Sequence, residues 1–332
     1  MPDVTPLRIG ILGAARIAPP AIVRPGRRVD GVEVVAVAAR DKARAEAFAT
    51  KHSIPRVLDS YEQLVNDPDI DAIYNPLPNG LHGRWTMAAM AAGKHVLCEK
   101  PFTADAEEAR TVAAAHAGTD LVLMEAFHYR YHPLFARVRE LIVTGAIGTV
   151  RHIEAALCFP LLSGKDIRWD PALAGGATMD AGCYPIHMIR HLARSEPTVL
   201  RAQARLRSPG IDRFMDMDLR FADGLTARAT CSMLSSKLLS VRLRVTGDDG
   251  EIRVLNPLAP DKFHRLTLRS KGEKHVEHST RRATYDFQLE AFARAIERGD
   301  AIVTGPDDAI ANMVVIDAVY RAAGLEPRQP TA

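Results

Sequence analysis

The sequence predicts an α/β protein of two domains. The first is a doubly wound domain with a parallel sheet, and the second is an α+β domain with a large, mainly antiparallel open sheet. Three observations support this. Up to about residue 130, short apolar segments alternate with helical ones. From about residue 148, strands follow one another through short turns. A length of 332 residues also fits two domains, which we place at residues 1–130 and 131–332.

The parallel sheet is predicted from six apolar segments, each bounded by turn residues or by a helical segment. The expected strands are residues 7–12, 32–38, 57–58, 70–74, 96–98 and 121–124. One helix is expected to open at residues 13–18, and a second to follow residues 40–44 and run through His52. Further helices are expected at residues 60–66, 81–92 and 105–116. In such a sheet, ligands bind beyond the carboxyl ends of the strands, so residues that follow a strand are candidates for a site.

The second domain is predicted from consecutive strands with few helices between them. We expect strands at residues 149–159, 202–206, 216–221, 225–233, 241–246 and 251–255, and helices at residues 182–192, 283–298 and 306–323. The basic cluster at residues 271–274 is interpreted as the solvated rim of a hairpin. An open antiparallel face is either covered or used for association, so the sequence predicts a homodimer through this face.

Composition excludes several classes of function. Hydrophobic residues make up 47% and charged residues 25% of the chain, as in soluble globular proteins. A net charge of +3 is too small to indicate a nucleic-acid partner. The four cysteines have neither disulfide-type nor metal-type spacing and predict free thiols in a reducing compartment. Without an apolar run of membrane length or a charged N-terminal region, we expect a cytoplasmic protein with no membrane partner.

The first strand and the turn after it resemble a dinucleotide-binding unit. A complete fingerprint would place glycines at 13, 15 and 18, whereas this chain has Gly13, Ala15 and Ala18. The next strand completes a βαβ unit and ends about where such folds bind the ribose of the nucleotide. This favours a Rossmann-type nucleotide site, and an ordinary strand-to-helix turn remains the alternative.

The end of the second expected strand indicates which nucleotide is preferred. An NAD-specific site usually has an acid at this point, whereas here Arg40 occupies it, followed by Asp41 and, one helical turn later, Arg44. Guanidinium groups bind a 2′-phosphate bidentately, so the sequence predicts NADP. NAD, with Asp41 on the ribose, remains possible.

A lysine at the end of the fifth expected strand is the first candidate for chemistry. The strand ends at Glu99, and Lys100 and Pro101 follow. Proline removes a backbone donor and disfavours the helical conformation for the preceding residue, so Lys100 is expected on an extended turn. An ordinary loop lysine is the alternative.

A second chemical segment covers residues 175–187. Pro185 fits only the first turn of a helix, so the helix is expected to begin near residue 181 or 182, with Asp180 at or just before its N-cap. Tyr184 lies four residues after Asp180 and can share a helix face with it. His187 and His191 continue this face without a convincing third ligand, and we predict no metal site.

Together, these motifs resemble those of a known family. Residues 13–18, 99–101, 125–130 and 175–184 occur in the order and spacing of the Gfo/Idh/MocA oxidoreductases. The similarity is greatest to the branch of dimeric dihydrodiol dehydrogenases and NADP-dependent D-xylose dehydrogenases, and it covers essentially the whole chain. Two departures stand out. His128 occupies a position where the dihydrodiol enzymes tend to carry tryptophan, and Ala15 departs from the strict glycine fingerprint.

The resemblance implies roles for particular residues. It implies that Lys100, Tyr184 and Asp180 are catalytic, and that His128 and Arg130 contact the substrate together with Asp180 and Tyr184. It also implies a set of cofactor contacts, which we expect at Gly13, Ala15, Arg16, Ile17, Arg40, Arg44, Pro76, Leu77, Asn79, His82, Glu99, Lys100 and Trp169.

The activity implied by the resemblance is hydride transfer between NADP and a secondary alcohol or hemiacetal hydroxyl of a sugar, polyol or cyclic diol. Tyr184 or Lys100 would accept the hydroxyl proton, and the sequence leaves open which of them does so. Two alternatives remain: a non-catalytic NADP-binding regulator, and an NAD-assisted glycosidase.

Overall fold

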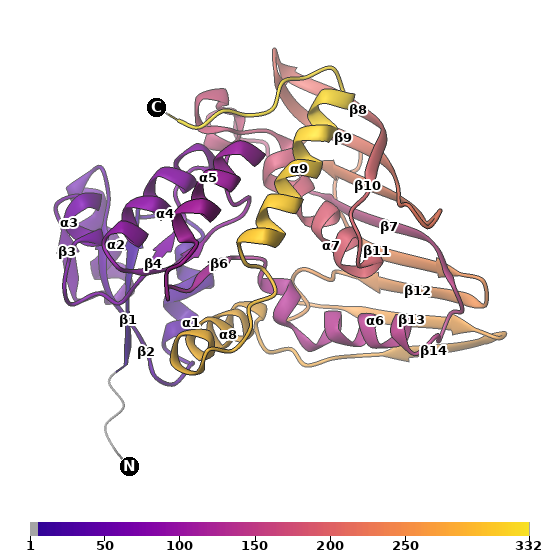
Figure 1. The fold of residues 1–332 in the computed structure, drawn as a ribbon, viewed down its shortest axis with the longest axis horizontal. Helices are drawn as coiled ribbons and strands as arrows, with labels where there is room; N and C mark the ends of the chain where they lie inside the picture. The colour runs from indigo at the N-terminus through magenta and orange to yellow at the C-terminus, as the bar shows by residue number, and fades with distance from the viewer. Residues whose placement is uncertain (1–5, 332) are drawn as a thin grey trace. The chain divides into compact units, whose positions relative to one another are not determined.

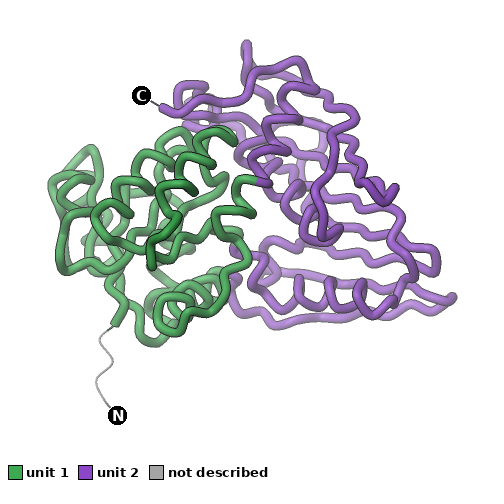
Figure 2. Tube along the Cα trace, in the orientation of Figure 1, with its two compact units in different colours: residues 1–127, 285–310 green, residues 128–284, 311–332 purple. Residues whose placement is uncertain are grey.

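The computed structural model describes residues 6–331, which divide into two compact units. The first unit consists of residues 1–127 and 285–310, and the second of residues 128–284 and 311–332 (Figure 2). The sequence predicted one boundary after residue 130, whereas the chain passes between the units after residues 127, 284 and 310.

A six-stranded sheet forms the centre of the first unit, and all of its strands are parallel, as predicted (Figure 1). The order is β3-β2-β1-β4-β5-β6. The strands are β1 (Leu7–Leu12), β2 (Val32–Ala38), β3 (Arg56–Leu58), β4 (Ala72–Asn75), β5 (His95–Cys98) and β6 (Leu123–Glu125). The order reverses direction between β1 and β4, which creates a topological switch point at their carboxyl ends.

Helices connect these strands, and their start points follow from capping residues. Asp41, Ser60 and Asp105 each accept a hydrogen bond from a backbone N–H three residues later. The helices are α1 (Arg24–Gly26), α2 (Lys42–His52), α3 (Tyr61–Val65), α4 (His82–Ala91) and α5 (Ala106–His116), with a 3₁₀ turn, η2 (Asn79–Leu81), before α4.

The connection after β1 differs from the expected helix that opens directly at Gly13. Residues 14 and 15 are irregular, residues 16 and 17 form a turn, and a π-helix, η1 (Pro19–Val23), follows and leads into α1. The two consecutive prolines, Pro19 and Pro20, account for this late start, because proline is best tolerated in the first turn of a helix.

The C-terminal part of the chain contributes a segment to the first unit. Helix α8 (Thr284–Arg298) is held by Arg28, whose Nε donates to Asp286 Oδ2 at 3.0 Å. Further along, the Thr304 hydroxyl donates to the Glu125 carbonyl oxygen at 2.8 Å, and the Glu125 N–H donates to the Thr304 carbonyl oxygen at 2.8 Å. Residues 285–310 are therefore tied to β6 and to the turn that follows α1.

The second unit contains an eight-stranded sheet with the order β14-β13-β12-β11-β7-β10-β9-β8 (Figure 1). Among the described strands of this sheet, β7 and β10 pair in parallel and all other neighbours are antiparallel, as the sequence predicted for most of the sheet. The strands are β7 (Val150–Cys158), β8 (Thr198–Ser208), β9 (Ile211–Arg220), β10 (Thr226–Ser232), β11 (Ser240–Gly247), β12 (Gly250–Leu255), β13 (Arg265–Ser270) and β14 (Glu273–Glu277).

Three elements of the second unit were not predicted as such: β13, β14 and α6 (Pro133–Val143). The β13–β14 turn lies at the basic cluster that was interpreted as a hairpin rim. Helix α6 lies alongside this hairpin in Figure 1, and Arg137 Nε donates to Glu277 Oε2 of β14 at 2.8 Å. Leu134, Val138 and Leu141 are buried on one face of α6.

Helix α7 (Cys183–Ala193) packs against β7 and β10 and is preceded by a π-helical turn, η6 (Thr178–Gly182). Short 3₁₀ turns η3 (His128–Tyr131), η4 (Ile167–Trp169) and η5 (Pro171–Leu173) occupy the connections, and α9 (Pro306–Ala322) runs from the first unit into the second. Among residues 6–331, no helix is both long and apolar enough to cross a membrane.

Candidate functional site

Gly13 shapes the turn at the carboxyl end of β1. Its φ of +84° lies in the region that favours glycine, and its N–H donates to the Ala38 carbonyl oxygen at 2.7 Å. A Cβ atom on Gly13 would lie 3.2 Å from Leu77 Cδ2, so the loops after β1 and β4 approach closely here. A side chain at this position would crowd Leu77 and strain the backbone.

Two arginines lie at the carboxyl end of β2, next to this turn. Arg40 and Arg44 are exposed, and Arg44 Nη2 donates to the Ala14 carbonyl oxygen at 3.2 Å. Asp41 is the N-cap of α2, where its Oδ1 accepts a hydrogen bond from the Arg44 N–H at 3.1 Å. Tyr61 lies nearby, and its hydroxyl hydrogen-bonds the Arg40 backbone. Burial raises the pKa of Tyr61 despite both guanidinium groups.

Further predicted cofactor residues of the first unit lie in the loops after β1 and β4. In the first loop, Arg16 is exposed, Ile17 is partly exposed, and the Ala15 N–H donates to the Gly13 carbonyl oxygen at 2.9 Å. In the second loop, Pro76 and Asn79 are buried.

Lys100 lies two residues after the end of β5 and is partly exposed, and the Lys100–Pro101 peptide bond is cis. The preceding Glu99 is buried, and its Oε1 accepts a hydrogen bond from the Tyr74 hydroxyl at 2.7 Å. Burial raises the pKa of Glu99 above its ordinary value, while the neighbouring Lys100 and Tyr74 oppose the shift. Lys100 is thus presented beside a buried, hydrogen-bonded carboxyl group.

His82 connects the loop after β4 to the loop after β5. Its Nε2 lies 2.7 Å from the Leu77 carbonyl oxygen, and its Nδ1 lies 2.7 Å from the Pro101 carbonyl oxygen. Burial lowers the pKa of His82 to about 4, although both carbonyl groups favour its protonation. Asn75 Nδ2 donates to the His82 carbonyl oxygen at 3.1 Å and fixes the start of α4.

In the second unit, Asp180 is the third residue of the π-helical turn η6. The sequence predicted it at or just before an N-cap, and this prediction is wrong. Helical structure begins at Thr178, three or four residues earlier than expected, and Pro185 therefore lies inside a longer helical run. The sequence places Pro185 in the first turn of the whole helical segment. In the structure the π-turn η6 precedes α7, so Pro185 is the third residue of α7 but lies well inside the helical segment. The Asp180 N–H donates to the Gly176 carbonyl oxygen at 3.0 Å.

Tyr184 lies in the first turn of α7 and is 7% exposed. Its hydroxyl oxygen is 3.3 Å from Nε2 of His128, a residue of η3. Nδ1 of His128 is 2.7 Å from the Thr284 hydroxyl oxygen, and both side chains are buried. The structure therefore joins Tyr184, His128 and Thr284 in one chain of contacts.

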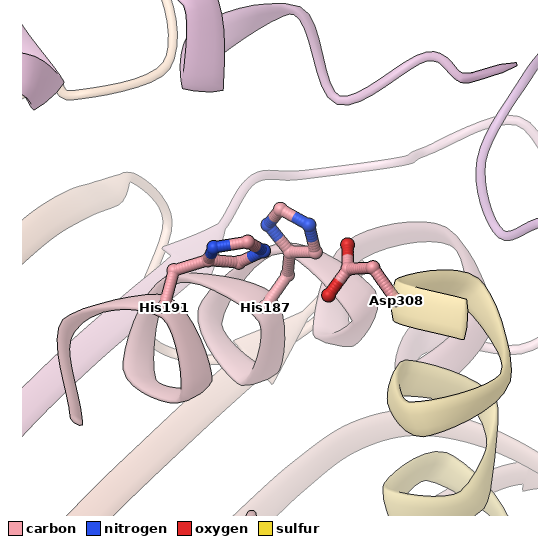
Figure 3. A group of neighbouring side chains, drawn as sticks. All are labelled: His187, His191 and Asp308. Carbon is pink, nitrogen blue, oxygen red and sulfur yellow. The ribbon is translucent and has the colours of Figure 1, made fainter. Parts of the chain in front are cut away.

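A second tyrosine–histidine pair lies beside the first. The Tyr129 hydroxyl oxygen is 2.5 Å from His187 Nδ1, and both residues are fully buried. His187 and His191 lie one turn apart on α7 with ring centroids 4.2 Å apart, and Figure 3 draws both together with Asp308 of α9. Arg130 Nε donates to His191 Nδ1 at 3.3 Å. Arg130 is buried.

Trp169 ends the turn η4 and is also buried. Its Nε1 donates to the Ser163 carbonyl oxygen at 3.1 Å, and the Arg207 guanidinium lies 4.7 Å from its ring centroid. These contacts anchor the loop of residues 161–170 on the second unit.

Sequence reasoning missed several residues that organise these loops: Tyr61, Tyr74, Asn75, Tyr129 and Thr284. Tyr61 could have been found, because β3 pairs with β2 and the residues after both strands share one edge of the sheet. Thr284 could not, because it is 156 residues from His128.

Comparison with known proteins supplies independent evidence. Residues 7–127 match the model of the Gfo/Idh/MocA oxidoreductase family with an NAD-binding Rossmann fold, and residues 135–253 match the Gfo/Idh/MocA C-terminal domain.

Individual relatives agree with these matches. D-xylose 1-dehydrogenase (NADP(+)) 2 of Haloferax volcanii is 37% identical, over 96% of this chain and 97% of its own length. Trans-1,2-dihydrobenzene-1,2-diol dehydrogenase of Sus scrofa is 34% identical, over 68% and 67% of the two chains. The structure of KijD10, a 3-ketoreductase from Actinomadura kijaniata in complex with NADP and TDP-benzene, has a TM-score of 0.88 and 28% identity, and the match covers 96% of this chain and 98% of that one. The chain belongs to the Gfo/Idh/MocA oxidoreductase family.

Proposed function

We propose that the protein transfers a hydride between NADP and a secondary alcohol or hemiacetal hydroxyl of a sugar, polyol or cyclic diol. The observation that carries the proposal is Lys100 at the carboxyl end of β5, in a chain of this family that also carries Asp180 and Tyr184. Relatives that act on D-xylose, on a dihydrodiol and on a 3-keto group support the substrate class.

The residues around the switch point fit NADP. Gly13 allows the tight turn after β1, at the sheet edge where such folds bind the phosphates of a nucleotide. Arg40 and Arg44 offer two exposed guanidinium groups beside that turn, suited to a 2′-phosphate. Asp41 is engaged as the N-cap of α2, which argues against its use as the ribose acceptor of an NAD site. When bound, the cofactor supplies the hydride chemistry at its nicotinamide ring.

Residues of the protein would accept the hydroxyl proton of the substrate. During oxidation, the substrate hydroxyl loses its proton to Tyr184 or Lys100, and the other group donates a hydrogen bond to the developing alkoxide. Asp180 orients Tyr184 or a substrate hydroxyl, and His128 and Arg130 lie on the same part of the second unit as Tyr184. We propose that Trp169, Glu99 and the loop at Pro76, Leu77 and Asn79 contact the cofactor.

A spectrophotometric screen tests this function. The purified chain is mixed with NADP⁺ and a panel of aldoses, inositols and cyclic diols, and formation of NADPH is followed. Saturable turnover with at least one of them is expected. Tight cofactor binding without turnover would point to a regulator, and sugar release without net reduction of the cofactor would point to a glycosidase.

We also propose a homodimer that forms through the face of the large sheet with ion-paired side chains. On this face Arg228 Nε donates to Asp216 Oδ1 at 3.1 Å, and Arg244 Nε donates to Glu251 Oε2 at 2.9 Å. Leu255, 45% exposed, lies on this face in register with Arg242 and contributes apolar area. Obligate interfaces of this kind bury about 2,000 Å² or more.

The dimer is tested by sedimentation at micromolar concentration. We expect a dimer for the wild type, a shift toward monomer for Leu255→Asp, and no shift for Leu162→Asp, which changes an exposed loop residue. A wild-type monomer would exclude the proposal.

The four cysteines are buried free thiols, which supports a cytoplasmic location.

A further inference from the structure

His128 is placed to act on Tyr184. Its two ring nitrogens face two different hydroxyl groups, Tyr184 at 3.3 Å from Nε2 and Thr284 at 2.7 Å from Nδ1. The imidazole and phenol rings meet edge to face, with centroids 5.9 Å apart and planes at 67°. His128 is 6% exposed and Thr284 is 2% exposed, so these contacts are shielded from bulk water.

A neutral imidazole makes this arrangement directional, because one ring nitrogen donates a hydrogen bond and the other accepts one. If Nδ1 donates to the Thr284 hydroxyl oxygen, Nε2 is the acceptor and faces the Tyr184 O–H. We propose that His128 is held in the Nδ1–H tautomer and takes up the phenolic proton of Tyr184 during substrate oxidation. This inference rests on the proposed function, in which Tyr184 receives the hydroxyl proton.

The proton transfer balances. The substrate O–H bond breaks and a new O–H bond forms on Tyr184, while the original phenolic O–H bond breaks and an N–H bond forms on His128 Nε2. The substrate also loses a hydride to NADP⁺ and becomes the ketone or lactone. The imidazolium holds the released proton, with Nδ1–H still directed at Thr284, until it exchanges with water. In reduction the same steps run in reverse.

The neighbouring pair of Tyr129 and His187 provides the comparison. It has the same two side chains, and its ring centroids are 5.7 Å apart. Tyr129 is 0% exposed and cannot touch a substrate, whereas Tyr184 is 7% exposed. We call the contacts from Tyr184 through His128 to Thr284 the relay. Among the described residues of this unit, Tyr129 and His187 are titratable groups next to it, and Asp180 lies one turn before Tyr184. We infer that the Tyr129 pair is structural and the Tyr184 pair functional.

The first test needs no substrate. In ¹⁵N-histidine-labelled protein, the signals of His128 are identified by their loss in His128→Gln. The chemical shifts are expected to report an Nδ1–H tautomer in the wild type and a change of tautomer or a mixture in Thr284→Val. An Nε2–H tautomer in the wild type would overturn the proposal.

The second test uses kinetics with the polyol that gives the highest kcat/KM. His128→Gln keeps hydrogen-bonding groups but cannot carry a proton, so we expect kcat to fall about tenfold to a hundredfold. We also expect a larger solvent deuterium isotope effect and an unchanged KM for NADP. Added imidazole should partly restore His128→Ala. Tyr129→Phe should lower the melting temperature but keep the isotope effect of the wild type.

The two proposals fail in different ways. If Tyr184→Phe keeps full activity, the proposed role of Tyr184 is wrong and the relay falls with it. If Tyr184→Phe is inactive while His128→Gln keeps the wild-type kcat and isotope effect, the relay alone is wrong.

Discussion

Arg328 Nη2 donates to Asp212 Oδ1 at 2.9 Å in the interior of the second unit, where Asp212 is 0% and Arg328 7% exposed. Arg328 Nε also donates to the Gly175 carbonyl oxygen at 2.7 Å. Asp212 Oδ2 accepts hydrogen bonds from both the N–H and the hydroxyl of Thr178 at 2.7 Å. Through this pair, the C-terminal segment is tied to the π-turn that carries Asp180.

Substitution of Arg328 by alanine should destabilise the second unit strongly. Removal of one partner leaves the Asp212 carboxylate buried without its guanidinium, which typically costs about 3–5 kcal/mol. Urea denaturation followed by circular dichroism measures the loss. Arg201→Ala is the control, because Arg201 and Asp218 form an exposed pair 3.5 Å apart that should contribute less than about 1 kcal/mol. Equal losses in both variants would contradict this prediction.

Gly176→Ala should prevent correct folding of the same region. Gly176 has a φ of +133°, and a Cβ atom there would lie 2.3 Å from Asp212 Oδ1 and 2.7 Å from Arg328 Nη2. The new methyl group would have to displace the buried ion pair. Gly210→Ala serves as the control, because Gly210 has a φ of +76° but no atom within 4 Å of its Cβ position. Expression yield and melting temperature should fall far more for Gly176→Ala.

Stability in acid should depend on His82. Its pKa is lowered to about 4 in the folded chain, so between pH 6.5 and 4 the unfolded chain binds the proton first. This contribution is present above pH 6.5 and is lost as the pH falls to about 4, and at about 1.4 kcal/mol per pKa unit it is worth roughly 3 kcal/mol.

The measurement is the free energy of unfolding from pH 7.5 to 4. In His82→Gln the part of the slope below pH 6.5 should be reduced, whereas His275→Gln, which changes an exposed residue of β14, should keep the wild-type slope. An unchanged slope in His82→Gln would show that His82 is not the group responsible.

The alternation of strands and helices was sufficient to predict the first sheet, because each buried strand of that unit is a short apolar run, whereas β13 and β14 of the second sheet were not predicted. It did not predict the pairing of β7 with β10 or the return of residues 285–310 to β6, since these depend on contacts between distant segments. Helix α6 was overlooked although Pro133 and its apolar spacing indicate a helix. Lys100, Asp180 and Tyr184 are proposed as site residues from motifs, whereas Thr284 and Arg328 act through tertiary contacts that no local pattern encodes.

Lys100→Met should leave the fold and the affinity for NADP nearly unchanged. Lys100 is partly exposed after β5. Loss of an acid–base or hydrogen-bonding group at the reacting oxygen typically costs a hundredfold or more in turnover, so kcat should fall by about that factor. Steady-state kinetics and cofactor titration by fluorescence test both parts. A correctly folded variant with near-wild-type kcat would remove Lys100 from the mechanism.

Arg40→Ala should shift the preference between the two nucleotides. The exposed guanidinium of Arg40 lies at the end of β2, Arg44 is anchored to the Ala14 carbonyl oxygen, and Asp41 caps α2. A 2′-phosphate adds about two negative charges, and charge-assisted hydrogen bonds contribute about 1.5–3 kcal/mol each. The wild type should therefore prefer NADP over NAD by roughly tenfold to a thousandfold in kcat/KM.

The ratio of kcat/KM for the two nucleotides is measured in wild type, Arg40→Ala and Arg44→Ala. Arg40→Ala should lower kcat/KM for NADP by about tenfold or more and leave that for NAD nearly unchanged, because NAD lacks the phosphate that the guanidinium binds. Arg24→Ala, which removes an exposed arginine of α1, is the matched control and should keep the wild-type ratio. If the wild type prefers NAD, or if Arg40→Ala keeps the wild-type ratio, Arg40 does not bind the 2′-phosphate, and the end of β2 has to recognise the ribose in another way.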